Sequence, residues 1–258
     1  MHWLSELYHY YNVEQADPRT NSWFFIENPL YLLSVVFGYI YFVLLCGPKY
    51  MEKRKPYSLK TAIFFYNLFQ IVINAIIVYE IYVIWTTDYS LGCEPVRQNI
   101  DKHVTDIVIW ILLLKTFDLL ETLIFVLRKK MKQVSFLHVY HHISTVLITY
   151  YIVKYHPGGM FLMLMIINGS VHVAMYTYYL FASLGSTMEN LTNIVKPYVT
   201  RIQIIQFLIL LVHQSQALFP SCSVSKKAAT IVVGDIILNL ALFLKFYRNN
   251  YTKSSKIA

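Results

Sequence analysis

The chain has 258 residues, of which 57% are hydrophobic and 14% charged, and its formal net charge is +8. A soluble domain carries about a quarter charged residues, whereas a helix that crosses a bilayer about 30 Å thick needs roughly 20 apolar residues. The composition excludes an ordinary soluble enzyme and predicts an all-α integral membrane protein with one membrane-embedded domain over residues 1–258. The basic residues lie beside apolar runs, so membrane topology explains the charge better than a nucleic-acid partner.

Seven apolar stretches follow in chain order, and each predicts a transmembrane helix. Residues 1–27 lack the apolar central stretch of a cleavable signal peptide, so the first span is expected to act as an uncleaved anchor. The predicted spans are Asn28–Gly47, Ala62–Trp85, Val104–Val126, Phe136–Val153, Gly159–Phe181, Ile202–Phe219 and Ala228–Phe246.

Basic residues set the expected orientation, because loops rich in lysine and arginine stay in the cytosol. The loops after the first and third spans and the C-terminal tail are basic, whereas the N-terminal segment has Arg19 alone against several acids. We therefore expect a lumenal N-terminal segment, about residues 1–27, and a cytosolic tail, about residues 247–258. Cys93 and Cys222 then fall in separate lumenal loops, where an oxidising environment favours a disulfide between them.

Polar side chains recur inside four predicted spans, where ionisable groups are costly and mark functional candidates. Their i, i+3 and i+4 spacing places each cluster on one helical face. Each cluster begins one to two turns from the cytosolic end of its span, which predicts a single polar layer reached from the cytosol. The alternative is that these groups only hydrogen-bond neighbouring helices together. The clusters are Lys115, Asp118, Glu121 and Thr122; His138, His141 and His142; Asn168, His172 and Tyr176; and Thr200, Gln203 and Gln206. His213 stands alone in the sixth span and fits a satisfied core histidine.

The segment Gln133–His142, QVSFLHVYHH, resembles the histidine box of the ELO family, the very-long-chain fatty acid elongases. Three further motifs resemble family motifs in the family's order. They are Lys115–Thr122 (KTFDLLET) running into LRKK, Asn168–Tyr179 (NGSVHVAMYTYY) and Thr200–Gln206 (TRIQIIQ). Asp118 departs from the pattern, because glutamate is usual there. The resemblance implies an endoplasmic-reticulum membrane enzyme whose fold is a ring of six helices around a narrow acyl tunnel, with a seventh helix outside.

The resemblance also implies a 3-oxoacyl-CoA synthase, which condenses a long acyl-CoA with malonyl-CoA and releases CO2 and CoA. None of the three cysteines lies in the polar layer, so a neutral imidazole is the strongest candidate for the acyl carrier. The roles expected by position are His141 as carrier with His172 facing it, Asn168 and Gln206 as oxyanion donors, His138 and His142 as orienting or proton-moving groups, and Lys115, Asp118 and Glu121 as a charge-balanced support.

Basic residues at the cytosolic mouth are expected to bind the CoA phosphates, although positive-inside topology alone also explains them. The predicted substrate-binding residues are Arg128, Lys129, Lys130, Gln133, Tyr176, Lys196, Thr200, Arg201 and Gln203. No bound cofactor or metal is expected. The expected partners are the two CoA substrates, membrane lipid, and the reductases and dehydratase of the elongation cycle. A homo-oligomer is a further possibility, and the sequence leaves the oligomeric state open.

Two other classes remain open at this stage. Di-iron desaturases and hydroxylases also carry His-x-x-His-His, but their two metals need several histidine boxes and this chain has one box plus His172. A seven-span receptor or carrier is the non-enzymatic alternative, because the number of spans says nothing about function.

Overall fold

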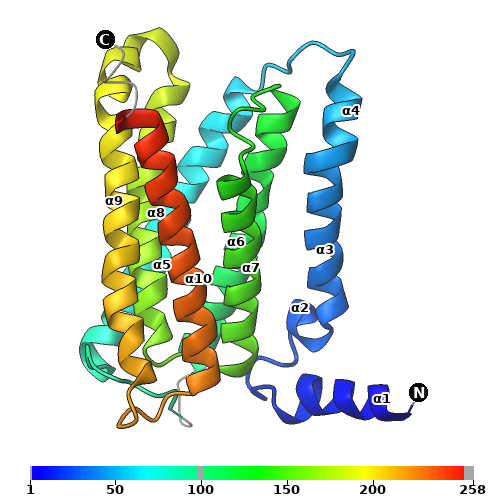
Figure 1. The fold of residues 1–258 in the computed structure, drawn as a ribbon, viewed down its shortest axis with the longest axis vertical. Helices are drawn as coiled ribbons and strands as arrows, with labels where there is room; N and C mark the ends of the chain where they lie inside the picture. Colours follow the sequence, from blue (N-terminus) through cyan, green and yellow to red (C-terminus); the bar gives the residue numbers. More distant parts are fainter. Residues whose placement is uncertain (1, 98–101, 253–258) are drawn as a thin grey trace. The chain divides into compact units, whose positions relative to one another are not determined.

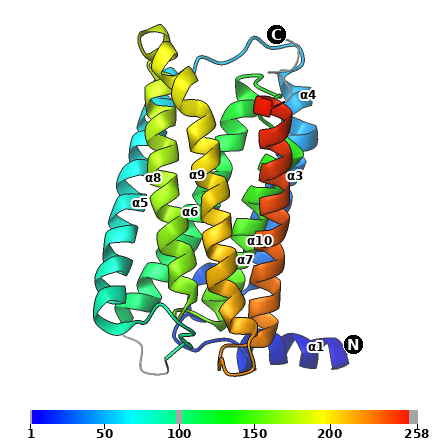
Figure 2. The ribbon, with the colours of Figure 1, turned by 60° about the vertical axis from the view of Figure 1, so that its left-hand side comes forward.

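Long helices make up most of the computed structural model, which describes residues 2–97 and 102–252 (Figures 1 and 2). No strand occurs within these ranges, so the predicted all-α class is confirmed. The helices divide into two units, and each unit combines two separate stretches of the chain. The first unit contains Met1–Ser58 and Val96–Phe161, and the second contains Leu59–Pro95 and Leu162–Ala258.

The first unit holds the helix pair that carries the predicted histidine box, α6 (Lys102–Leu127) and α7 (Phe136–Tyr155). The two helices pack against each other and agree with the third and fourth predicted spans to within two residues at each end. Helix α7 begins where it does because the Ser135 side chain accepts a hydrogen bond from the His138 amide, as an N-cap residue does.

A nearly continuous helical stretch in the same unit corresponds to the first predicted span and runs one turn beyond it. Asn28 accepts a hydrogen bond from the Leu30 amide, which fixes the start of the stretch. A Cβ atom on Gly47 would lie 2.7 Å from Val126 Cγ1, so only glycine allows the stretch to approach α6 this closely. The stretch consists of α3 (Pro29–Tyr41), the π-helical turn η2 (Phe42–Cys46) and α4 (Gly47–Met51).

The N-terminal segment is partly helical, which the sequence analysis does not predict. Its elements are α1 (His2–His9), the π-helical turn η1 (Tyr10–Glu14) and α2 (Phe24–Glu27). Lys154, near the end of α7, is almost fully buried and donates to Asn12 Oδ1 at 2.6 Å and to the Ile26 carbonyl at 2.5 Å. Thr20 Oγ1 donates to the Val153 carbonyl at 2.8 Å. These hydrogen bonds to α7 hold the N-terminal segment in place. A hydropathy profile cannot predict them, because they join residues that are far apart in the sequence.

The second unit contains three further long helices and α5, the counterpart of the second predicted span. A Cβ atom on Gly169 would lie 2.7 Å from Val78 Cγ2, so α8 approaches α5 closely at this glycine. The rings of Phe207 and Phe243 pack at 5.1 Å between α9 and α10. The elements are α5 (Lys60–Asp88), α8 (Phe161–Ser183), the 3-10 turn η3 (Gly185–Met188), α9 (Glu189–Ser215), the 3-10 turn η4 (Gln216–Leu218), α10 (Lys226–Tyr247) and the π-helical turn η5 (Arg248–Thr252).

One predicted boundary in this unit is wrong. Helix α9 begins at Glu189 rather than Ile202 and continues through Pro197, although most side chains of its first three turns are exposed. Hydropathy marks only the apolar part of a helix, so it does not show that the helix starts earlier in a polar segment. The predicted end of the seventh span, Phe246, agrees with the end of α10 at Tyr247 to within one residue, and the π-helical turn η5 follows to Thr252. The cytosolic tail over residues 247–258 stays a prediction. The last six residues of that tail lie outside the described ranges.

Five helical stretches among the described residues are long and apolar enough to cross a membrane: Pro29–Met51, Lys60–Thr87, Phe161–Ser183, Glu189–Leu218 and Lys226–Thr252. Large apolar side chains such as Phe37, Tyr79 and Val212 are exposed on them, as expected for surfaces that face lipid. Helices α6 and α7 are not among the five, since α6 carries charged side chains and α7 carries histidines. Their crossing, the count of seven spans and the ring around a tunnel stay predictions.

A disulfide joins Cys93, after α5, to Cys222, after η4, with the Cα atoms 5.6 Å apart. The pairing predicted from topology is therefore present in the structure. Lys226 tightens the same end of the unit by donating to the carbonyls of Ala217, Phe219 and Cys222. Cys46 forms no disulfide.

Candidate active site

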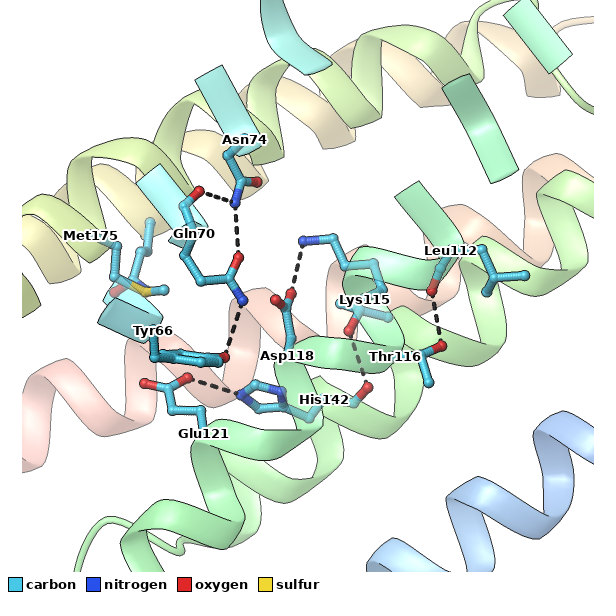
Figure 3. A network of polar contacts seen from close by, with 12 residues as sticks. Tyr66, Gln70, Asn74, Leu112, Lys115, Thr116, Asp118, Glu121, His142 and Met175 are labelled. Atoms are coloured by element: carbon cyan, nitrogen blue, oxygen red, sulfur yellow. Dashed lines mark hydrogen bonds and ion pairs between the residues drawn. The ribbon is translucent and has the colours of Figure 1, made fainter. Parts of the chain in front are cut away.

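Helix α6 presents the predicted acidic and basic residues on one buried face. Lys115, Asp118, Glu121 and Thr122 are all at least nine-tenths buried. Lys115 Nζ and Asp118 Oδ2 lie 3.2 Å apart and form an ion pair one turn apart (Figure 3). A charged pair buried to this degree requires mutual compensation. The role of Lys115, Asp118 and Glu121 as a charge-balanced support stays a prediction. The shorter Asp118 side chain still reaches the lysine.

Two histidines of the histidine box contact this face of α6. His142 Nε2 lies 3.6 Å from Glu121 Oε2 (Figure 3), and His138 Nε2 lies 2.9 Å from Thr122 Oγ1. The rings of His138 and His142 pack at a centroid distance of 4.3 Å. His141 lies between them in sequence, is half-buried, and has its ring 6.0 Å from that of His142. The structure therefore gathers two predicted clusters, those of the third and fourth spans.

One trio in this cluster also has the chemistry of a metal site. Glu121, His138 and His142 each offer a ligand atom, and these atoms lie within 4.8 Å of one another. A carboxylate with two imidazoles suits zinc or iron. The expectation that no metal is bound stays a prediction, and metal analysis of purified protein tests it.

In the second unit, α8 carries Asn168, His172 and Tyr176 at four-residue intervals, and all three are buried. The His172 and Tyr176 rings pack edge-on at 5.6 Å, and Tyr176 packs on Tyr66 of α5 at 5.9 Å. The structure therefore places the predicted residues of the fifth span on one face. His141 belongs to the other unit, so its predicted position opposite His172 stays a prediction.

Helix α9 contributes the predicted amides. Gln203 Nε2 lies 3.3 Å from Met175 Sδ on α8. Gln206 is 4% exposed, and its Oε1 has no hydrogen-bond partner among the described residues. A buried amide oxygen without a partner can accept a hydrogen bond from a donor group. The predicted stabilisation of an oxyanion would instead use the amide nitrogen, which donates. Thr200 bonds back to the Lys196 carbonyl at 3.5 Å.

His213, further along α9, is not the satisfied core histidine that the sequence suggests. Its ring packs against Trp85 at 6.3 Å, and Nδ1 lies 3.2 Å from Gln214 Nε2. However, its Nε2 is buried and has no hydrogen-bond partner within 2–97 and 102–252.

Sequence reasoning missed a polar ladder on α5. Gln70 Nε2 donates to the Tyr66 hydroxyl at 3.0 Å, and Asn74 Nδ2 lies 3.1 Å from Gln70 Oε1 (Figure 3). The neighbouring Asn67 is 3% exposed, and its Nδ2 has no partner among the described residues. The signal was present, because these residues recur every three or four positions within an otherwise apolar span.

The basic residues predicted to bind CoA, together with Gln133, lie in the segment that joins α6 to α7 in the first unit and inside α9 in the second. Arg128 is half-buried, Lys129, Lys130 and Gln133 are exposed, and Lys129 ends α6 in the left-handed region with φ 54°. Lys129 Nζ donates to the Glu52 carbonyl at 3.1 Å. In the second unit Lys196 and Arg201 are exposed. Arg201 Nε donates to the Tyr247 hydroxyl at 2.7 Å, and its guanidinium lies over the Tyr198 ring. Arg201 is therefore partly engaged with α10.

Comparison with known proteins identifies the chain over nearly its whole length. A family model described as ELO, GNS1/SUR4 family, matches residues 24–258. Human very long chain fatty acid elongase 1 is 35% identical over 253 residues, covering 95% of this chain and 90% of the relative. Very long chain fatty acid elongase F of Drosophila melanogaster is 36% identical over 241 residues, covering 90% and 92%. A very long chain fatty acid elongase of Aedes aegypti is 34% identical over 261 residues, covering 99% and 72%.

Together with the five apolar helices, these matches establish a multi-pass membrane protein. The chain therefore belongs to the ELO family, also described as the GNS1/SUR4 family.

Proposed function

We propose that this chain catalyses the condensing step of fatty acid elongation as a 3-oxoacyl-CoA synthase. The observation that carries the proposal is the packing of the histidine box against the polar face of α6. His138 lies beside Thr122, His142 lies beside Glu121, and the half-buried His141 belongs to the same box on α7. Family membership supports the same conclusion, because the relatives are named as very long chain fatty acid elongases.

In the proposed first half-reaction, an imidazole nitrogen of His141 attacks the acyl thioester. The carbon–sulfur bond breaks, an acyl-imidazole forms, and CoA leaves as the thiol with the imidazole proton. In the second half-reaction malonyl-CoA loses CO2, and the electron pair of the broken carbon–carbon bond forms an enolate. The enolate attacks the acyl carbonyl and expels the imidazole, which takes up one proton. The product is a 3-oxoacyl-CoA two carbons longer.

We propose supporting roles for the remaining groups. His172 and Asn168 share one face of α8, where an imidazole and an amide can stabilise a developing oxyanion. Glu121 holds the ring of His142, and Lys115 with Asp118 supplies a charge-neutral background. The basic residues after α6 are positioned to bind CoA phosphates. We place the enzyme in the endoplasmic-reticulum membrane with a lumenal N-terminus, acting with the reductases and dehydratase of the cycle and without a bound cofactor.

The test is release of labelled CO2 from malonyl-CoA that depends on long-chain acyl-CoA. Purified protein mixed with acyl-CoA alone is expected to release about one equivalent of CoA and to retain the acyl label. His141→Ala is expected to abolish both signals, whereas His9→Ala, on the exposed N-terminal helix, is expected to keep them. Stoichiometric CoA release by folded His141→Ala would rule out His141 as the carrier.

Metal content separates this function from the di-iron alternative. A desaturase or hydroxylase requires iron and an electron donor, so its activity is lost on chelation. We expect condensation to persist after exhaustive chelation. Loss of activity on chelation, with recovery on adding iron or zinc, would contradict a metal-free mechanism and point to Glu121, His138 and His142.

A further inference from the structure

A chain of hydrogen bonds links three helices of the first unit and ends on the histidine box. The Tyr39 hydroxyl of α3 lies 2.9 Å from Thr122 Oγ1 of α6. Thr122 Oγ1 lies 2.9 Å from His138 Nε2 of α7. Tyr39 is 5% exposed and Thr122 is fully buried, so water does not compete for either hydroxyl.

The arrangement fixes the direction of both hydrogen bonds. Within the described residues, the Tyr39 hydroxyl has Thr122 as its only hydrogen-bond partner, and the Thr122 hydroxyl has only Tyr39 and His138. A buried hydroxyl proton without an acceptor is costly. If His138 donated to Thr122, and Thr122 to Tyr39, the phenol proton would have no acceptor. If Tyr39 and His138 both donated to Thr122, the Thr122 proton would have no acceptor. Tyr39 therefore donates to Thr122, and Thr122 donates to His138 Nε2.

The behaviour of Thr122 differs from that of other threonines on the same helix pair. Thr116 of α6 donates to the Leu112 carbonyl at 2.9 Å, and Thr145 of α7 donates to the His142 carbonyl at 3.1 Å. Such bonds to the preceding turn are the usual choice for a helical threonine. Thr122 instead directs its hydroxyl across to the neighbouring helix.

We propose that Tyr39 is a positioning residue that acts through Thr122 to fix the tautomer and ring orientation of His138. His138 is then a neutral imidazole with its proton on Nδ1, packed 4.3 Å from the ring of His142 and 5.3 Å from that of Phe125. The ionisable groups around it are Glu121, His141 and His142. The role in catalysis rests on the proposed function, because it requires that the histidine box performs the condensation.

This inference extends the site to α3, the helix of the first predicted span, in which the sequence analysis finds no candidate site residue. The hydrogen bond from Thr122 selects one tautomer, because a neutral imidazole that accepts at Nε2 carries its proton on Nδ1. Loss of the relay allows His138 to exchange tautomers and rotate. The ring of His142, which packs on His138 and lies beside Glu121, then loses one of the contacts that hold it in place.

Kinetics of four variants test the relay. Tyr39→Phe is expected to lower kcat about tenfold, the effect of one buried hydrogen bond, with little change in KM for acyl-CoA. Thr122→Val is expected to be worse, because it also leaves the Tyr39 hydroxyl without an acceptor. Thr122→Ser is expected to recover most of the rate. The double variant Tyr39→Phe/Thr122→Val is expected to be no slower than Thr122→Val alone, since the two residues act in series.

Two variants serve as matched controls. Tyr41→Phe removes a phenol from the same helix at an exposed position, and Thr116→Val removes a hydroxyl that bonds only to its own helix. Both are expected to retain wild-type kcat. Equal losses in Thr116→Val and Thr122→Val would show that α6 is merely sensitive to a lost hydroxyl and would overturn the proposal.

The tautomer itself provides a readout that does not depend on elongase activity. Imidazole nitrogen spectra of histidine-labelled protein, with His138→Gln for assignment, are expected to show His138 protonated at Nδ1 and unprotonated at Nε2. Thr122→Val is expected to produce exchange between tautomers. Protonated Nε2 in the wild-type protein would refute the relay even if condensation is fully active. An enzyme that fails to condense but has the expected spectrum would refute the proposed function alone.

Discussion

The close approach of α8 to α5 at Gly169 predicts a specific steric defect. Substituting alanine adds a Cβ atom that would lie 2.7 Å from Val78 Cγ2, well inside van der Waals contact. Val78 is β-branched and has little rotameric freedom in a helix, so the backbones must separate. Overpacking of this kind costs about 1–3 kcal/mol. Because the same Cβ atom would lie 3.8 Å from Asn74 Oδ1, the separation also displaces the polar ladder of α5.

The assay is thermal unfolding of purified protein in detergent, together with the condensation rate. Gly169→Ala is expected to lower the midpoint and the rate, and Gly169→Ala/Val78→Ala is expected to be more stable than Gly169→Ala alone. Gly38→Ala and Gly234→Ala are the controls, because nothing lies within 4 Å of a Cβ atom at either position. These two are expected to be neutral or slightly stabilising, by up to about 1 kcal/mol. Equal destabilisation of all three glycine variants would refute the steric argument.

Three further predictions concern other parts of the molecule. Neutralising the basic residues after α6 should raise KM for acyl-CoA and leave kcat nearly unchanged, because charge-assisted phosphate contacts are lost; unchanged KM would contradict a CoA-binding role. Asparagine is chosen at the left-handed position, in the variant Arg128→Gln, Lys129→Asn, Lys130→Gln. Cys93→Ser, Cys222→Ser and the double variant should lose the same few kcal/mol of stability, with condensation kept at low temperature; a loss in only one single variant would argue against the bond. Burial alone would raise the pKa of Asp17, but hydrogen bonds and the charge of Arg19 outweigh it and lower that pKa. Protection of the N-terminal segment from proteolysis should therefore be complete above the ordinary value of about 3.9, fall as pH drops through the lowered pKa, and lose this dependence in Asp17→Asn.

Much of the site follows from the sequence because polar groups in apolar spans are few and costly. Helical periodicity places Lys115, Asp118 and Glu121 on one face of α6. It likewise places the three histidines of the histidine box on one face of α7. The same reasoning also applies to the ladder of Tyr66, Gln70 and Asn74. It was missed because the amide side chains of the second span were not counted as functional candidates in the way that charged side chains were. The disulfide also follows, since opposite ends of the spans have different redox environments.

The sequence by itself determined the helical class, the positions of most long helices and the residue types available for chemistry, because hydropathy and helical periodicity are local properties of the chain. Only the tertiary structure decided which groups meet. The pairing of Thr122 with His138, the contribution of Tyr39 from α3 and the anchoring of the N-terminal segment by Lys154 all join residues on different helices or distant segments. Hydrogen-bond direction depends on every neighbour of a buried hydroxyl, and those neighbours are set by helix packing rather than by spacing along the chain.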